Sequence, residues 1–190
     1  CLFPSEGILK VGWLTVDIEN LAAVRRAVGM VFQNPDDQLF MPTVFEDVSF
    51  GPLNLGVKEA ELEGKVMDAL ETVGAAHLRS RPPYRLSQGE KRAAAIAGVL
   101  VMSPDILIMD EPTSSLDPMS RRRLINLLKT FKHTKIMATH DLDFAMELCE
   151  RTIVIHKGVM TADGPTREIF RDAELLERSS LEMPPSLRGR

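Results

Sequence analysis

An uninterrupted apolar run, Ile106-Leu107-Ile108-Met109, constrains the fold of this chain more than any other segment. Strands buried on both faces of a parallel sheet have such continuous runs, because helices cover both faces. Two acids, Asp110 and Glu111, follow the run directly. Open α/β sheets bind their ligands at the carboxyl ends of their strands. The run therefore predicts an α/β fold with a functional site beside these two acids.

The rest of the chain alternates between patterns typical of strands and patterns typical of helices. Such alternation with short links predicts a mostly parallel sheet covered by helices. The expected strands cover residues 8–11, 29–33, 106–109, 135–139, 151–156 and 159–162. The expected helices outside the central region cover residues 20–26, 118–132 and 142–148.

Residues 44–102 have an almost wholly helical pattern, which predicts an inserted helical subdomain. Its apolar stripe includes Leu62, Val66 and Leu70, and Gly74 is placed to stop that helix. The two consecutive prolines within residues 79–86 predict an extended linker into a further helix.

Composition narrows the possible classes of protein. The 190 residues are 44% apolar and 26% charged, with a formal net charge of −4. This acidic balance disfavours a protein that holds nucleic acid by neutralising phosphates, so we expect no nucleic-acid partner.

The longest run without polar side chains, residues 93–102, is about half of the ~20 residues that cross a bilayer. The amino end lacks a secretory-signal pattern, and Cys1 and Cys149 make no disulfide framework, so we expect a reducing compartment.

The acids that follow the buried run have the chemistry of a phosphoryl-transfer site. The carboxylate of Asp110 could hold Mg²⁺, and Glu111 could polarise a water molecule for attack on a phosphoryl group. Acids also occur at strand ends simply because they are well solvated there. From these residues alone, the functional interpretation is the stronger one.

The segment Leu86-Ser87-Gln88-Gly89-Glu90 has two interpretations. Ser87 and Glu90 have the spacing of a capping box, which is an ordinary way to begin a helix. The same helix terminus could bind an anion, because its backbone N–H groups are unpaired and Gly89 allows close approach. The two roles can coexist.

Two further residues are candidates at strand ends. His140 follows the strand expected at residues 135–139, where it could reach a terminal phosphate or the attacking water. Gln33 ends the strand expected at residues 29–33 and could touch metal or water through its amide. The other histidines, His77, His133 and His156, have no companion residues and are interpreted as structural.

Taken in order, five segments resemble the ATP-binding subunits of ABC transporters over roughly residues 5–170. In that family they are the Q-loop, the signature motif, the Walker B strand with its catalytic glutamate, the D-loop and the switch histidine. The segments are Val31-Phe32-Gln33-Asn34-Pro35, Leu86-Ser87-Gln88-Gly89-Glu90, residues 106–113, Ser115-Leu116-Asp117-Pro118 and Thr139-His140-Asp141. A narrower resemblance, in residues 32–40, 43–44 and 50–56, is to the ATPases of energy-coupling-factor importers for cobalt, nickel and vitamins.

The resemblance implies an ABC ATPase fold that binds ATP and Mg²⁺, with nucleotide held between two subunits arranged head to tail. Asp110 would anchor Mg²⁺, Glu111 would be the general base, and His140 would hold the γ-phosphate. Gln33 would contact both metal and water. The nucleotide-binding residues of the signature motif and the D-loop would be Ser87, Gln88, Gly89, Glu90 and Asp117.

The resemblance also implies a division of the chain and a second partner. Residues 1–42 would be a partial ATPase core, 43–104 the helical subdomain, 105–170 the remaining core and 171–190 a tail, poorly ordered from Ser179. Short helices of an integral membrane component would dock near residues 40–50, although the apolar residues there could equally be core. The protein would then lie at the cytoplasmic face of the cell membrane.

Three features depart from the family pattern. The P-loop, G-x-x-x-x-G-K-[ST], is absent, and Gly64-Lys65 lies in a helical stripe without the required context. We therefore expect a chain truncated at its amino end, which alone binds ATP weakly through its own site. Gln88 stands where the signature has glycine, and Glu90 replaces its final glutamine; we expect Lys91 or Arg92 to offset the charge of Glu90. There are two alternatives to an ATPase subunit of an ABC importer. One is a soluble ABC-type ATPase, and the other is an inert fragment that lends its signature helix to a partner.

Overall fold

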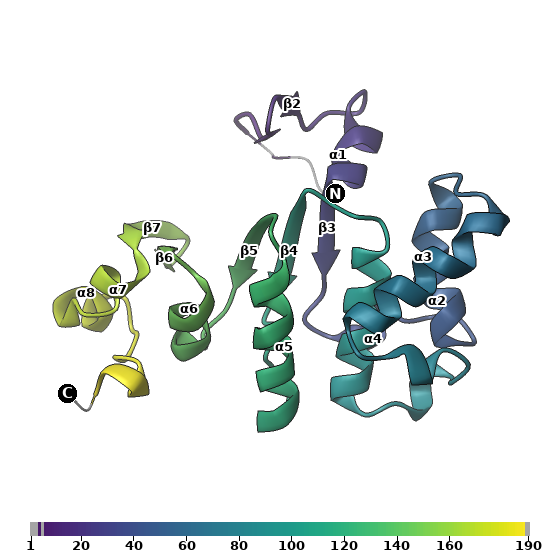
Figure 1. The fold of residues 1–190 in the computed structure, drawn as a ribbon. Helices are drawn as coiled ribbons and strands as arrows, with labels where there is room; N and C mark the ends of the chain where they lie inside the picture. The colour runs from purple at the N-terminus through teal and green to yellow at the C-terminus, as the bar shows by residue number, and fades with distance from the viewer. Residues whose placement is uncertain (1–3, 5, 189–190) are drawn as a thin grey trace. The chain divides into compact units, whose positions relative to one another are not determined.

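The computed structural model describes residue 4 and residues 6–188, so Cys1 and Ser5 lie outside the described residues. The chain forms two compact units (Figure 1). The first contains Cys1–Pro112 with Lys132–Ile136, and the second contains Thr113–Phe131 with Met137–Arg190. Each unit is described by itself. Within the described residues, no helix has the length and apolar character needed to cross a membrane.

The central sheet has the strand order β3-β4-β5, formed by Val28–Val31, Ile106–Asp110 and Thr134–Ala138. Strands β3 and β4 pair in parallel, which confirms the expected α/β class. Burial along β4 alternates, because only one of its faces is fully covered: Leu107 and Met109 are completely buried, while Ile106 and Ile108 are partly exposed. Burial on both faces, expected from the apolar run, is therefore not observed.

Three helices build the helical part of the first unit: α2 (Val44–Asn54), α3 (Glu59–Thr72) and α4 (Gln88–Leu100). Gly74 has a φ of +73° just after α3, the left-handed conformation that suits a glycine at a helix end. The linker expected to be extended, residues 79–86, is instead mostly turns and bends: it contains a turn at residues 79–80 and a 3₁₀ turn, Pro83–Arg85, and Pro82 and Leu86 are extended. The shared core of these helices consists mainly of Val44, Val48, Leu62, Val66, Leu70, Leu78, Ala94, Ala95 and Ala97.

The amino-terminal residues of the first unit add a small hairpin and one helix. Strands β1 (Lys10–Val11) and β2 (Leu14–Thr15) pair antiparallel, so the strand expected at residues 8–11 is shorter than predicted. Helix α1 (Leu21–Ala27) then leads directly into β3 and buries Val24.

The second unit joins helices α5 (Pro118–Thr130) and α6 (Leu142–Leu148) to the antiparallel pair β6 (Arg151–His156) and β7 (Val159–Pro165). Two short helices follow, α7 (Thr166–Ile169) and α8 (Ala173–Arg178). The bounds of α6 and β6 are those expected from the sequence.

The end of the chain differs from the expected tail. Residues Leu181, Met183 and Leu187 pack against a buried cluster that includes Phe170 and Leu176. Ser179 is itself buried. The apolar residues between the polar ones therefore attach this segment to the second unit, an interaction that the prolines and polar residues of the sequence did not reveal.

Helix α4 lies against β3 at a residue that has no side chain. A Cβ atom at Gly29 would come within 2.3 Å of Val99 Cγ1 and 2.9 Å of Pro104 Cγ. Both distances are shorter than real Cβ contacts. Gly29 is therefore required for the close approach of the helix to the strand that leads to Gln33.

Replacing this glycine tests the close approach. Gly29→Ala is expected to lower the free energy of unfolding by about 1–3 kcal/mol, because Val99 and Pro104 must shift to admit the methyl group. The matched control is Gly64→Ala on the exposed face of α3, where nothing lies within 4 Å of the added atom. Since alanine is the better helix former, this control is expected to gain about 0.5–1 kcal/mol. Urea denaturation followed by circular dichroism measures both; equal midpoints would contradict the packing.

Candidate functional site

Gln33 lies at the edge of the sheet where β3 ends. Val31 pairs with Met109 in the parallel register of β3 and β4. Asp110 and Glu111, which follow Met109, therefore lie at the same end of the sheet as Phe32 and Gln33, which follow Val31. The structure thus brings the predicted metal-binding and catalytic residues Gln33, Asp110 and Glu111 to the same edge of the sheet.

Glu111, the first residue after β4, has a strained backbone. Its φ is +40°, a left-handed conformation that side chains other than glycine rarely adopt. Strain of this kind costs on the order of 1–3 kcal/mol and is concentrated at functional positions. The positive φ of Glu111 therefore indicates that the position of its side chain is important for function.

The residues at this edge could bind Mg²⁺ together with the phosphates of a substrate. Among the residues that the structure describes, no three His, Cys, Asp or Glu side chains form a group that could hold a metal ion. At phosphoryl-transfer sites, however, Mg²⁺ is held by one or two carboxylates together with substrate phosphates. The Asp110 carboxylate and the Gln33 amide are oxygen donors of the required kind.

The loop after β3 is held by its own side chains. The Asn34 side chain accepts a hydrogen bond from the Asp36 amide at 3.2 Å and caps a 3₁₀ turn, Pro35–Asp37. The Gln38 side chain accepts from the Phe32 amide at 3.3 Å and donates to the Ala95 carbonyl of α4 at 2.8 Å. This loop is therefore attached to α4 at its far end.

Two basic residues of α4 also contact the loop. Lys91 forms an ion pair with Asp36 at 2.6 Å. Arg92 is only 3% exposed and donates to the carbonyls of Phe32 and Gln33, at 2.6 and 2.5 Å. Burial lowers the pKa of the Arg92 guanidinium.

The amino end of α4 forms the capping box that the sequence predicts. The Ser87 side chain accepts from the Glu90 amide, and the Glu90 carboxylate accepts from the Ser87 amide at 2.8 Å and from its hydroxyl at 2.9 Å. These bonds from Ser87 hold the pKa of Glu90 below its usual range. Gln88 is exposed and Gly89 is partly buried in the first turn.

The expectation that Lys91 or Arg92 offsets the charge of Glu90 is wrong. Lys91 and Arg92 contact Asp36 and the loop carbonyls instead, because their side chains leave the helix toward the loop. The charge of Glu90 is stabilised by Ser87 and the helix terminus. Phosphate at this terminus would therefore compete with Glu90 for the Ser87 hydroxyl.

The remaining predicted residues, Asp117 and His140, belong to the second unit. Asp117 caps α5, accepting from the amides of Met119 and Ser120 at 2.9 and 3.0 Å. A hydrogen bond from the Ser120 side chain is the main cause of the lowered pKa of Asp117. His140 is exposed after β5. The convergence of these two residues with the acids after β4 stays a prediction.

Asp141 fixes the backbone next to His140. Its carboxylate caps α6 by accepting from the Phe144 amide at 2.9 Å, and it accepts from Arg121 Nε and Nη2 at 2.9 and 3.1 Å. Burial alone would raise the pKa of Asp141, but the bonds from Arg121 and Phe144 outweigh burial and hold this pKa below its usual range. The segment that contains His140 is thus anchored to α5.

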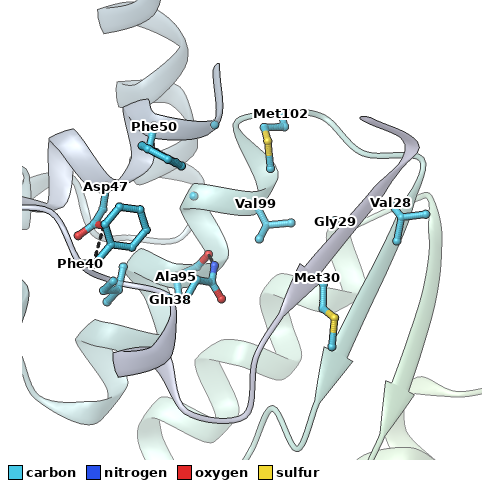
Figure 2. A pocket seen from close by; sticks show the side chains of 13 residues that line it. Val28, Gly29, Met30, Gln38, Phe40, Asp47, Phe50, Ala95, Val99 and Met102 are labelled. Atoms are coloured by element: carbon cyan, nitrogen blue, oxygen red, sulfur yellow. Dashed lines mark hydrogen bonds between the residues drawn. The ribbon is translucent and has the colours of Figure 1, made fainter. Parts of the chain in front are cut away.

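The first unit also contains a pocket of about 190 Å³ that the sequence did not predict (Figure 2). It is lined by residues of β3, the loop after β3, α2 and α4. Phe40 and Phe50 meet edge to face at its margin, with ring centroids 5.0 Å apart, and both are exposed. Exposed aromatic side chains beside a hollow are typical of a docking surface.

Asp47 lines this pocket and is 9% exposed. Its Oδ1 accepts from the amides of Phe40 and Met41 at 2.9 and 3.0 Å, whereas Oδ2 has no hydrogen-bond partner among the described residues. Burial is the main cause of its raised pKa. Sequence reasoning did not single out Asp47, and it gave Arg92 a different role, the offset of the charge of Glu90. The available signal was a charged residue three or four positions from a buried apolar residue on the same helix, Val44 for Asp47 and Ile96 for Arg92.

The Arg121–Asp141 pair predicts a stability change that depends on pH. Arg121→Met is expected to lower the free energy of unfolding at pH 7 by about 1–2 kcal/mol, since the carboxylate loses two charge-assisted hydrogen bonds. A carboxyl with a lowered folded-state pKa stabilises the protein above the pH at which the unfolded chain titrates. The difference from the parent chain should therefore shrink as the pH falls below about 4.

Urea titrations at pH 7 and at acidic pH measure this difference. The matched control is Arg151→Met, which removes the guanidinium from the exposed pair with Asp163. This control should have a smaller effect at neutral pH. A loss for Arg121→Met that does not change with pH would show that packing, and not the ion pair, is responsible.

Comparisons with known proteins show the family of this chain. The family model for ABC transporters matches residues 2–114. A Geobacter sulfurreducens protein, provisionally named an ABC transporter ATP-binding protein, is 62% identical over 99% of this chain and 76% of its own length. The energy-coupling factor transporter ATP-binding protein EcfA of Methanothermobacter thermautotrophicus is 45% identical over 96% of this chain and 60% of its own length.

A solved structure shows the same fold. CbiO1 of Clostridium perfringens, described as part of the ABC transporter complex CbiONQ, matches with a TM-score of 0.80 and 39% sequence identity. The match covers 93% of this chain and 73% of CbiO1. The chain therefore belongs to the ABC transporter ATP-binding family, whose activity is ATP hydrolysis coupled to transport.

Proposed function

We propose that this protein is the ATP-hydrolysing subunit of an ABC importer that takes up a metal ion or a vitamin. The observation that carries the proposal is the parallel pairing of Val31 with Met109, which brings Gln33 and the two acids at the end of β4, Asp110 and Glu111, to one edge of the sheet. The similarity to EcfA and to CbiO1 supports an energy-coupling-factor importer. The transported substrate would be selected by a different polypeptide.

Each of the predicted site residues would have its own task in hydrolysis. Asp110 and Gln33 would hold Mg²⁺ through oxygen atoms. Bound Mg²⁺ would neutralise charge on the phosphates of ATP. Glu111 would accept a proton from the attacking water as its oxygen approaches the γ-phosphate. His140 would donate a hydrogen bond to that phosphate.

The amino end of α4 would act on a nucleotide held mainly by a second ATPase subunit. Backbone N–H groups near Gly89 and the positive end of the helix favour an anion there. Ser87, Gln88 and Glu90 would contact the same nucleotide. The D-loop residue Asp117 would link the two nucleotide sites of the dimer. In this proposal the second subunit is another copy of this chain or a related one.

The pocket lined by Phe50 and Asp47 would receive a short helix of the integral membrane component. Its exposed aromatic rim, Phe40 and Phe50, suits the apolar face of an amphipathic helix. Because the pocket borders the loop of Gln33, docking would connect the membrane component to the hydrolysis site. The protein would then lie at the cytoplasmic face of the cell membrane.

Replacement of the proposed base tests the catalytic role. Glu111→Gln in the native ATPase complex is expected to lower ATP turnover by about 10²–10⁴-fold while ATP still binds, because only the proton acceptor is lost. Phosphate release and binding of a fluorescent ATP analogue measure the two properties. The control is Asp105→Asn, an exposed acid just before the amino end of the same strand, which should stay within about twofold of the parent. Unchanged turnover in Glu111→Gln would refute the base.

A charge in the pocket tests the membrane partner. Phe50→Glu is expected to abolish co-purification of an integral membrane protein, because a buried carboxylate would oppose the docked helix. Leu53→Glu, on the same helix but outside the pocket lining, is the control and should retain the partner. Absence of any membrane protein from the parent preparation would favour the soluble ABC-type ATPase. A parent preparation that contains no membrane protein and also does not bind ATP would favour an inert fragment.

A further inference from the structure

Arg92 occupies an unusual position for a charged residue. It lies in the second turn of α4, follows the Ser87 cap by five residues, and is 3% exposed between the buried Ala94 and Ala95 and the loop after β3. Its Nη1 donates to the carbonyl of Phe32 and its Nη2 donates to the carbonyl of Gln33. One planar group therefore holds two consecutive peptide units.

Stability alone does not account for a buried arginine here. The Nε atom has no hydrogen-bond partner among the described residues, and burial opposes the charged form. Burying a charge costs free energy unless the charged group is paired and fully hydrogen-bonded. What the guanidinium supplies is geometry, because its rigid, forked donors fix the direction of both carbonyls.

The other contacts between α4 and the loop reach other atoms of the loop, and through Gln38 they also reach the Phe32 amide. Lys91 contacts Asp36, whose side chain is half exposed, and Ala95 accepts from Gln38. Among the hydrogen bonds of the described residues, those of Arg92 are the ones that reach the Gln33 peptide itself. Arg92 is thus placed to control Gln33, whereas Lys91 is placed to support the loop.

We propose that Arg92 is a positioning residue that sets the place of Gln33 at the sheet edge and ties it to α4. This inference rests on the proposed catalytic role of Gln33. Since α4 also carries Ser87 and Gly89 at its amino end, a shift of the helix when nucleotide binds there moves the Gln33 carbonyl with it. Arg92 thereby couples nucleotide at the helix terminus to the position of Gln33.

A double-mutant cycle in the native ATPase complex tests the coupling. Arg92→Lys keeps the charge but loses the forked donors, and it is expected to lower kcat about tenfold while KM for ATP changes less than about twofold. In a Gln33→Ala background the same substitution should change kcat by less than about twofold, because both act through one group. The control, Lys91→Gln, should stay within about twofold of the parent. Multiplicative effects of Arg92→Lys and Gln33→Ala would overturn the proposal.

Hydrogen exchange of the 190-residue chain tests the contact without hydrolysis. The Phe32 amide, which donates to the Gln38 side chain, is expected to exchange at least about tenfold faster in Arg92→Lys than in Lys91→Gln, because Arg92 holds the carbonyl of the same residue. Equal exchange in the two variants would overturn the contact. Normal turnover in Glu111→Gln would instead refute the proposed function, so the two failures are distinguishable.

Discussion

The contact between α4 and β3 is the constraint on which the first unit depends. Gly29 permits an approach that any side chain would prevent, and α4 then supplies part of the helical core through Ala94 and Ala95. The same helix contacts the loop after β3 through Lys91, Arg92 and the Ala95 carbonyl. One helix therefore joins the sheet, the helical part and the loop that carries Gln33.

Several residues that the family resemblance assigns to nucleotide binding already stabilise helix ends. Ser87 and Glu90 cap α4, and Asp117 caps α5. Their hydrogen bonds lower the pKa values of both acids, so these groups are charged at neutral pH. A nucleotide arriving at these positions would exchange one set of hydrogen bonds for another, which favours reversible binding over tight capture.

The sequence predicted those features that depend on neighbouring residues. The bounds of α6 and β6, the capping box at Ser87 and the glycine stop after α3 all follow from spacings of a few residues. The contacts of Arg92 join residues about sixty positions apart in the chain, and no local pattern reveals them. The same is true of the packed carboxyl-terminal residues, whose burial depends on a cluster formed by distant segments.

The left-handed backbone at Glu111 has a consequence for how this chain could change. Glycine would adopt that φ without steric cost, so selection for folding alone would favour glycine at the end of β4. A carboxylate at this position retains an energetic penalty that the rest of the unit must outweigh. At this position the chain can have the residue that best fits the backbone or a carboxylate, but not both.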